Sequence, residues 1–308
     1  MIQTVLLTLY QVIVPLSIPV IAGALLGRFK NLDTKPLLTL YLYFLSPAII
    51  LDTLATADIS FDDVYKTLAF SLLNLFLLWA LANVLGTILK LAPPELAGLT
   101  LVSTFTNSVN YGLPLVLLAF GQLGLDKASV YVIGQMVIVN TLGVYFAARS
   151  QFSVKNAVKS VFSLPAIYAA ILALGLRALH LHMPHEVASG VAMVAGAYSP
   201  VVLAILGAQM VKVRVAQVER KLQSAFWTGL TVRLFLAPLI AYLGLTLLHI
   251  TGPLFSVLLI LASMPVAVNA VVLAERFNAS ADLVSRCILW TTLASFIVLP
   301  ILIALVAL

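Results

Sequence analysis

The sequence predicts an all-α protein that crosses a membrane many times. Of its 308 residues, 62% are hydrophobic and 9% are charged, whereas roughly a quarter of the residues of a soluble domain are charged. The mean hydropathy is +1.13. Apolar runs of 19 to 28 residues recur along the chain, and about 20 such residues cross a bilayer as one helix. A soluble enzyme and a disordered chain are therefore excluded, and the long alternating strands of a membrane barrel are absent.

Ten runs are long enough to span a bilayer. Pro36 and Pro253 suit the first turn of a helix, and Asp126 and Asp282 suit helix N-termini. The first run has no basic segment before it and no small-residue cleavage site, so we expect a retained helix rather than a signal peptide. In chain order the predicted spans are Val5–Arg28, Pro36–Leu54, Val64–Leu89, Glu95–Phe120, Asp126–Ala148, Ala157–Leu179, Glu186–Val211, Lys221–Leu248, Pro253–Arg276 and Ala281–Val306.

The basic residues fall mainly in alternate loops of this arrangement. Thirteen of the 17 lysines and arginines lie on one side, three lie on the other, and Arg233 lies inside a span. Because cytoplasmic loops collect Lys and Arg, we expect a multi-pass inner-membrane protein with both termini outside. The net charge of +6 then reflects topology, and no nucleic-acid partner is expected.

An internal repeat relates each span to the span five places later. The segment from Leu45 to Leu51 resembles the segment from Tyr198 to Ala204, and Pro114 matches Pro265 at an offset of 151. Because five is odd, the predicted five-helix repeats, residues 1–149 and 150–308, have opposite orientations in the membrane. Many secondary transporters have inverted repeats of this kind, with the substrate site near the midplane where the repeats meet.

Spans four and nine carry matched signs of a helix break. Gly112 and Pro114 disfavour a continuous helix within a polar stretch, and Asn107 lies about 18 Å from the start of span four, near mid-bilayer. Broken backbone at that depth is tolerated where it is buried or lines a wet cavity, and paired breaks point to a transport site. The candidate substrate-binding residues are Asn107, Ser108, Asn110, Gly112, Pro114, Pro265, Ala267 and Asn269.

The chemistry of these breaks favours an anion. Half-helices beginning after Pro114 and around Ala267 would present unpaired N–H groups and the positive end of a helix dipole to a carboxylate. The amides of Asn107, Asn110 and Asn269 would donate to the same anion or coordinate a cation. The alternative is structural: asparagine and serine side chains link helices, and prolines only kink them.

Other polar residues within the spans are candidates for the cavity or for an ion site. Arg233 would pair with a substrate carboxylate or with half-helix carbonyls. No acid lies deep in a span, so the coupling ion stays open between H⁺ and Na⁺, and no metal site or other cofactor is expected. Besides Arg233, the candidates are Ser46, Gln135, Asn140, Ser199 and Gln209, for which helix–helix contacts are the alternative.

At these residues the chain resembles the auxin efflux carrier family, which includes plant PIN-type carriers and bacterial malonate or malate transporters. The segment from Asn107 to Leu115 is similar to the family's first broken segment, and the segment from Met264 to Asn269 is similar to its second. The resemblance implies a scaffold domain and a crossover domain, two broken helices that cross at the substrate site, elevator-like alternating access, organic-anion substrates and a homodimer. Asn110 stands where an apolar aromatic residue is usual, and the long loop of the plant carriers is absent, so auxin is not the expected substrate.

The function predicted from the sequence is secondary transport of a small organic anion, such as a mono- or dicarboxylate, across the inner membrane. One alternative is a sodium-coupled bile-acid-type symporter. From another class, the chain would be a non-transporting receptor or a membrane enzyme. An enzyme would need a buried nucleophile, a metal cluster or an acid–base pair. Cys287 is the only cysteine, and we expect no enzymatic activity.

Overall fold

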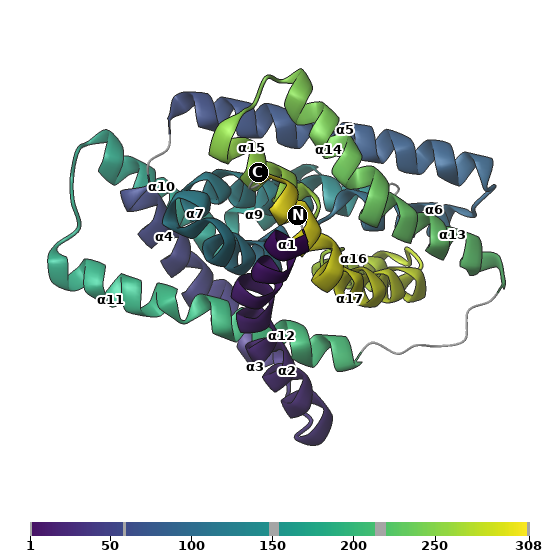
Figure 1. Ribbon diagram of the computed structural model, residues 1–308, viewed down its shortest axis with the longest axis horizontal. Coiled ribbons are helices and arrows are strands. Elements are labelled where there is room, and N and C mark those ends of the chain that lie inside the picture. Colours follow the sequence, from purple (N-terminus) through teal and green to yellow (C-terminus); the bar gives the residue numbers. More distant parts are fainter. Residues whose placement is uncertain (1, 58–59, 148–153, 213–219, 307–308) are drawn as a thin grey trace.

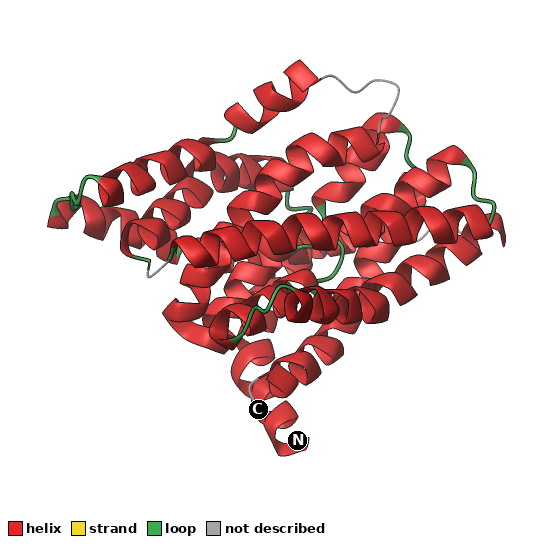
Figure 2. Ribbon diagram, turned by 90° about the horizontal axis from the view of Figure 1, so that it is seen from above, coloured by secondary structure: helices red, strands yellow, loops and turns green. Residues whose placement is uncertain are grey.

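The computed structural model describes residues 2–57, 60–147, 154–212 and 220–306 (Figure 1). Within these residues all regular elements are helical (Figure 2), and the only β-type pairing is one isolated bridge. Seven helical stretches are long and apolar enough to cross a membrane: Val5–Phe29, Thr34–Ala55, Phe61–Ile88, Ser108–Gly143, His185–Val211, Leu222–Leu247 and Ala281–Val306. The prediction of an all-α polytopic membrane protein is confirmed.

The first half of the chain forms long helices with short π-helical segments inserted in them. Leu32 and the residues around it connect the first two helical stretches. The elements are α1 Ile2–Thr8, η1 Leu9–Ile13, α2 Val14–Phe29, α3 Thr34–Leu40, η2 Tyr41–Leu45, α4 Ser46–Thr56, α5 Phe61–Ile88, α6 Pro93–Thr104, η3 Ser108–Gly112, α7 Leu113–Ile138, η4 Val139–Gly143 and α8 Val144–Ala147.

The second half is also helical, and its described residues contain one π-helical segment. Its elements are α9 Val154–Phe162, α10 Pro165–Ala178, α11 His185–Gly196, α12 Tyr198–Lys212, α13 Arg220–Thr231, η5 Val232–Leu236, α14 Ala237–Leu247, α15 Gly252–Ala262, α16 Asn269–Phe277 and α17 Ala281–Val306. The predicted boundary between the repeats, at residues 149 and 150, lies outside the described residues.

Most π segments have a simple cause in the sequence. Four of the five in the described residues are followed at once by a helix with proline in its first turn, at Pro15, Pro47, Pro114 and Pro238. Proline has no N–H to donate, and its ring crowds the carbonyl four residues earlier. A π turn, with its wider hydrogen-bond ring, accommodates that residue without ending the helix. These prolines therefore lie within spans and do not break them.

Spans four and five are connected differently from the prediction. The expected loop before Asp126 is reduced to a sharp kink at Gly121 (φ 65°, ψ −157°), where two helices meet within the range of α7. Positive φ is the conformation that glycine adopts without steric cost. Asp126 lies one turn beyond this bend and accepts a hydrogen bond from Gln122 (Nε2 to Oδ1, 3.0 Å), so its expected place at the helix N-terminus is wrong by about a turn.

The helices pack into two groups, each drawn from both halves of the chain. In the first group α2 packs along α12, and α4 packs against α10 and α11. The second group contains α5 to α7 and α13 to α17 (Figure 1). The α2–α12 contact depends on glycine: a Cβ atom on Gly23 would lie 1.9 Å from the Ala204 carbonyl oxygen, and one on Gly207 would lie 1.9 Å from that of Val20. Small residues allow such close approach of membrane helices.

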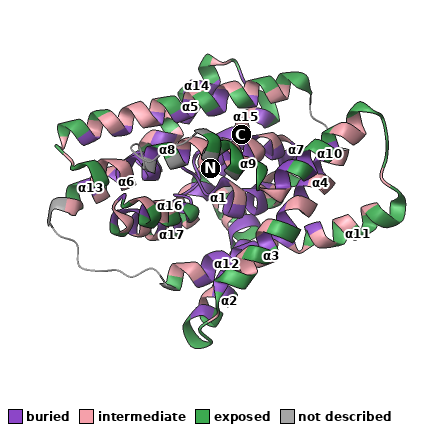
Figure 3. Ribbon diagram, turned by 180° about the vertical axis from the view of Figure 1, so that it is seen from behind, coloured by how far each residue is buried: buried purple, intermediate pink, exposed green. Residues whose placement is uncertain are grey.

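The outward faces of both groups are apolar. Large hydrophobic side chains such as Leu25 on α2, Phe76 on α5 and Leu239 on α14 are exposed. Figure 3 shows exposed stretches along these outer helices. Apolar surface on this scale is unusual for a soluble monomer and is typical of a membrane contact. Lipid is the environment that would cover it.

Candidate functional site

The two predicted breaks meet in the interior. The Asn107 N–H donates to the Pro265 carbonyl (2.8 Å), and the Ala267 N–H donates to the Phe105 carbonyl (3.0 Å). These bonds frame an antiparallel bridge between Thr106 and Val266. A helix break frees backbone groups that must find partners when water is excluded. Here each broken segment supplies the partners of the other.

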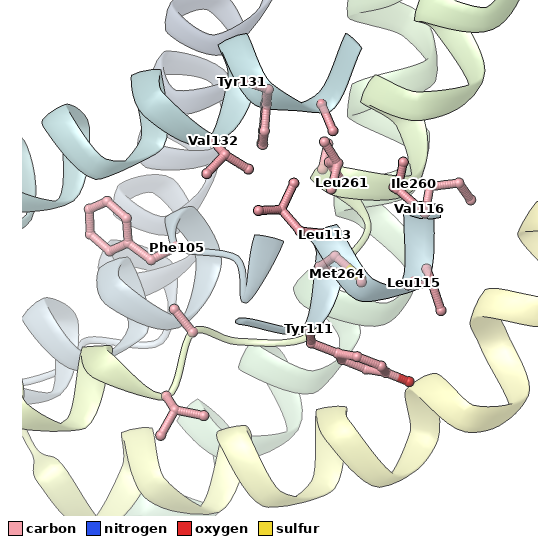
Figure 4. Packing of buried hydrophobic residues seen from close by; sticks show 14 of the residues in the cluster. Phe105, Tyr111, Leu113, Leu115, Val116, Tyr131, Val132, Ile260, Leu261 and Met264 are labelled. Carbon is pink, nitrogen blue, oxygen red and sulfur yellow. The ribbon is translucent and has the colours of Figure 1, made fainter. Parts of the chain in front are cut away.

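Apolar packing holds the crossing in place. Tyr111 and Leu113, just after the first break, lie near Leu261 and Met264 of the second broken segment (Figure 4). A Cβ atom on Gly112 would lie 2.7 Å from a Leu261 methyl carbon. Gly112 therefore allows close packing between the two segments, and it does not itself end a helix.

The first break lies earlier than predicted. Helix α6 ends at Thr104, Phe105 is extended, and the chain becomes helical again at Ser108. The expectation that a half-helix begins after Pro114 is wrong, because the π turn η3 accommodates that proline within a continuous helix. In the second segment α15 ends at Ala262 and α16 begins at Asn269, as expected around Ala267.

A cavity of about 80 Å³ lies beside the crossing, between the two helix groups. On the same measure one water molecule needs roughly 10–15 Å³, so the cavity has room for several waters or a small ligand. Its lining consists of Tyr41, Leu42, Ser46, Thr106, Asn107, Val109, Asn110, Gln135, Met136, Val139, Leu164, Pro165, Ala166, Ala267, Val268 and Asn269.

Six of the candidate residues from the sequence lie together in this lining: Ser46, Asn107, Asn110, Gln135, Ala267 and Asn269. Ser108, Gly112, Pro114 and Pro265 belong to the crossing segments but do not line the cavity, and neither do Ser199, Gln209 and Arg233. The side chain of Asn140 is outside the described part of the structure.

Tyr41 is the main lining residue that the sequence did not indicate. It begins the π segment η2, and its carbonyl accepts the N–H of Ser46, five residues later. The π turn places residues five apart on one side of the helix, so Tyr41 and Ser46 both reach the cavity. A search at the ordinary helical spacing of three or four residues would not have paired them.

The cavity lining contains polar side chains among apolar ones but no formal charge: none of the described residues that line it is an acid, a lysine, an arginine or a histidine. Asn107 and Asn110 are 3% and 6% exposed, and Asn107 Nδ2 and Asn110 Oδ1 have no hydrogen-bond partner among the described residues. Asn269 is exposed at the start of α16. The charge of a ligand here would be balanced by amides and helix ends.

Comparison with known proteins identifies the family. The family model described as a membrane transport protein matches residues 4–164 and 150–303. The chain belongs to the auxin efflux carrier family. It is similar to an uncharacterized transporter of Methanothermobacter thermautotrophicus, at 30% identity over 66% of each chain. It is also similar to an uncharacterized transporter of Methanocaldococcus jannaschii, at 25% identity over 89% of this chain and 90% of that protein.

The buried arginine of this carrier binds helix ends. Arg233 is 0% exposed. Its Nη1 donates to the Ser103 carbonyl (3.0 Å) in the last turn of α6, and its Nη2 donates to the Ala262 carbonyl at the end of α15. Of the two roles that the sequence left open for Arg233, this geometry corresponds to the contact with half-helix carbonyls. For the alternative, a pair with a substrate carboxylate, Arg233 is not among the residues that line the cavity.

A tyrosine connects the two helix groups of the carrier. The Tyr198 hydroxyl, on α12 of the first group, donates to the Val109 carbonyl (3.1 Å) in η3, directly after the first break. Its ring lies 5.9 Å from that of Tyr41 in the cavity wall. This polar contact joins the first group directly to the crossing.

Proposed function

We propose that this carrier is a secondary transporter of a small organic anion, with a mono- or dicarboxylate as the substrate class. The observation that carries the proposal is the meeting of two broken helices beside a cavity that has three asparagines and no charged side chain in its lining. Each helix N-terminus is equivalent to about half a positive charge. The two N-terminal ends, at Ser108 and Asn269, together balance about one negative charge, which favours a singly ionised carboxylate.

The asparagine side chains would orient the bound carboxylate by hydrogen bonds. Asn107 Nδ2 is a buried donor without a partner among the described residues, and an unsatisfied buried donor is costly. A carboxylate oxygen in the cavity would satisfy it. Asn269 lies at the exposed side of the lining, where it would meet the ligand as it enters.

The proposed architecture has ten spans in two inverted five-helix repeats, residues 1–149 and 150–308. In support, the first helix group combines predicted spans one and two with six and seven, and the second combines three to five with eight to ten. Each span thus groups with its repeat partner. The cavity lies between the groups, so an elevator-like movement of one group against the other would expose it to either side. Termini outside the inner membrane and a homodimer remain part of the proposal.

Uptake into proteoliposomes tests the transport proposal. Acetate, propionate, malonate and malate are offered with pH and sodium gradients varied separately, which also separates H⁺ coupling, Na⁺ coupling and uniport. Uptake that requires sodium would favour the bile-acid-type symporter. Ligand binding without flux would favour a receptor.

The site assignment is tested by Asn269→Ala. The loss of a hydrogen bond to a charged group costs about 1.5–3 kcal/mol, so uptake should fall by at least about tenfold while the protein stays folded. Gln209→Ala is the control, because Gln209 is a half-buried amide of a span that does not line the cavity. Uptake by Asn269→Ala at the wild-type rate would refute the assignment.

A further inference from the structure

Each broken helix of the crossing has two new ends, and the cavity meets only the N-terminal ones. The C-terminal ends, at Thr104 of α6 and Ala262 of α15, carry negative partial charge and carbonyls that no further helical turn can satisfy. In a buried crossing these two ends repel each other and weaken the positive field of the N-termini beside them. A positively charged group or hydrogen-bond donors must therefore compensate the negative partial charge of these two ends.

Arg233 is placed to compensate both ends. It is fully buried on η5, and its two terminal nitrogens bind one carbonyl from each helix end, at Ser103 and Ala262. Neither ion pair found in the described residues involves it. Two helix C-termini supply about one negative charge in total, which matches one guanidinium. The planar fork of arginine suits such a two-point contact better than lysine does.

We propose that Arg233 is a positioning residue of the anion site. It holds the two C-terminal ends together and offsets their charge, so that the N-terminal ends at Ser108 and Asn269 keep their full attraction for an anion. It acts from behind the crossing and does not touch the ligand. The part that concerns the ligand rests on the proposed function, whereas the part that concerns the crossing does not.

A disulfide across the β-bridge reports on the crossing without any ligand. Thr106 and Val266 face each other as a non-hydrogen-bonded antiparallel pair, for which the Cα atoms are about 4.5 Å apart. That separation is within the range of about 4.4–6.8 Å that disulfides need. Thr106→Cys and Val266→Cys are introduced together with Cys287→Ala, which removes the only natural cysteine. The disulfide equilibrium against a glutathione series then measures how well the segments are held together.

Three further substitutions are compared in this background. Arg233→Gln removes the charge, and Arg233→Lys keeps it without the fork. Arg177→Gln is the matched control, because Arg177 also donates from Nη1 to a carbonyl, that of Ala57, but lies at the end of α10, away from the crossing. We expect Arg233→Gln to lower the disulfide equilibrium constant roughly fivefold or more, Arg233→Lys to fall between it and the wild type, and Arg177→Gln to have no effect.

Ligand affinity separates the charge effect from a general loss of structure. Titration calorimetry with propionate and with uncharged propionamide is performed on the same variants without the cysteine pair. Arg233→Gln should weaken propionate binding roughly fivefold or more and leave propionamide unchanged. A merely structural role would weaken both ligands alike.

The outcomes separate this proposal from the transport proposal. Wild-type protein that binds no carboxylate, with the disulfide effect of Arg233→Gln still present, would contradict the proposed function and retain the role of Arg233 at the crossing. A wild-type disulfide equilibrium in Arg233→Gln would overturn the role of Arg233. If that variant does not fold, the same result in Arg233→Lys would overturn it.

Discussion

Asn110 is a residue that is expected to lower the stability of the ligand-free protein and to serve ligand binding. Its side chain is 6% exposed, and its Oδ1 has no partner among the described residues. Leaving an acceptor buried and unsatisfied costs about 1–3 kcal/mol. A buried polar group without a partner is typical of binding sites, where a ligand rather than the protein supplies the missing hydrogen bond.

We therefore expect Asn110→Leu to raise the stability of the ligand-free protein by about 1 kcal/mol or more and to impair uptake. Leucine has a similar volume and no polar atom that needs a partner. The thermal midpoint in detergent and uptake in proteoliposomes measure the two effects. Asn74→Leu is the control, because Asn74 Oδ1 is also buried without a described partner but does not line the cavity. It should stabilise the protein and leave uptake unchanged; impaired uptake there would show that the loss is not specific to the cavity.

At the scale of elements, the contact between α2 and α12 depends on backbone approach. Gly23 faces the Ala204 carbonyl so closely that any side chain would overlap with it. Close approach of this kind is a main source of helix association in lipid, where there is no hydrophobic driving force between helices. The first helix group should therefore be sensitive to the addition of a few atoms at this position.

Gly23→Val should separate α2 from α12 and destabilise the protein by about 3 kcal/mol or more, because a carbonyl of the helix backbone cannot move aside as a side chain can. Size-exclusion profiles and thermal melts in detergent would show the loss. In Gly190→Ala, a Cβ atom meets no heavy atom within 4 Å, and this exposed helical glycine should gain about 1 kcal/mol from the higher helix propensity of alanine. A wild-type melt for Gly23→Val would contradict the close contact.

At the scale of the whole molecule, the two helix groups must separate and rejoin if the cavity is to face both sides of the membrane. The hydrogen bond from Tyr198 to the Val109 carbonyl joins them in the present arrangement. The net contribution of one hydrogen bond to stability is about 1 kcal/mol. This corresponds to a roughly fivefold change in the equilibrium between two arrangements of the groups.

Tyr198→Phe should therefore change the maximal transport rate by up to about fivefold and have little effect on folding. Counterflow and net uptake in proteoliposomes measure the rate. Tyr168→Phe is the matched control, because the Tyr168 hydroxyl donates to the Phe162 carbonyl (2.7 Å) and does not join the two groups. Equal effects of the two substitutions would argue against a role for Tyr198 between the groups.

The membrane class, the helical fold and the two interrupted segments were predictable because they depend on local properties. Hydropathy decides which stretches can lie in lipid, whatever packs beside them. Polar residues at mid-span, as at Asn107 and Asn269, are tolerated only where they are buried in protein or line a wet cavity. The asparagines of the cavity could therefore be named from the sequence, and a place in a transporter family followed from the same residues.

Which side chains face the cavity was decided by the tertiary structure. Each π turn adds a residue to its turn and rotates everything after it relative to a regular helix. Ser46, which directly follows η2, thereby reaches the lining, whereas Ser199, its counterpart in the second half, does not. Because the π turn η3 accommodates Pro114 within a helix, the first break lies before Ser108 and not at Pro114. Arg233 binds two carbonyls that lie 130 and 29 residues away along the chain. These partners depend on how distant helices meet, and no local pattern in a single sequence specifies that.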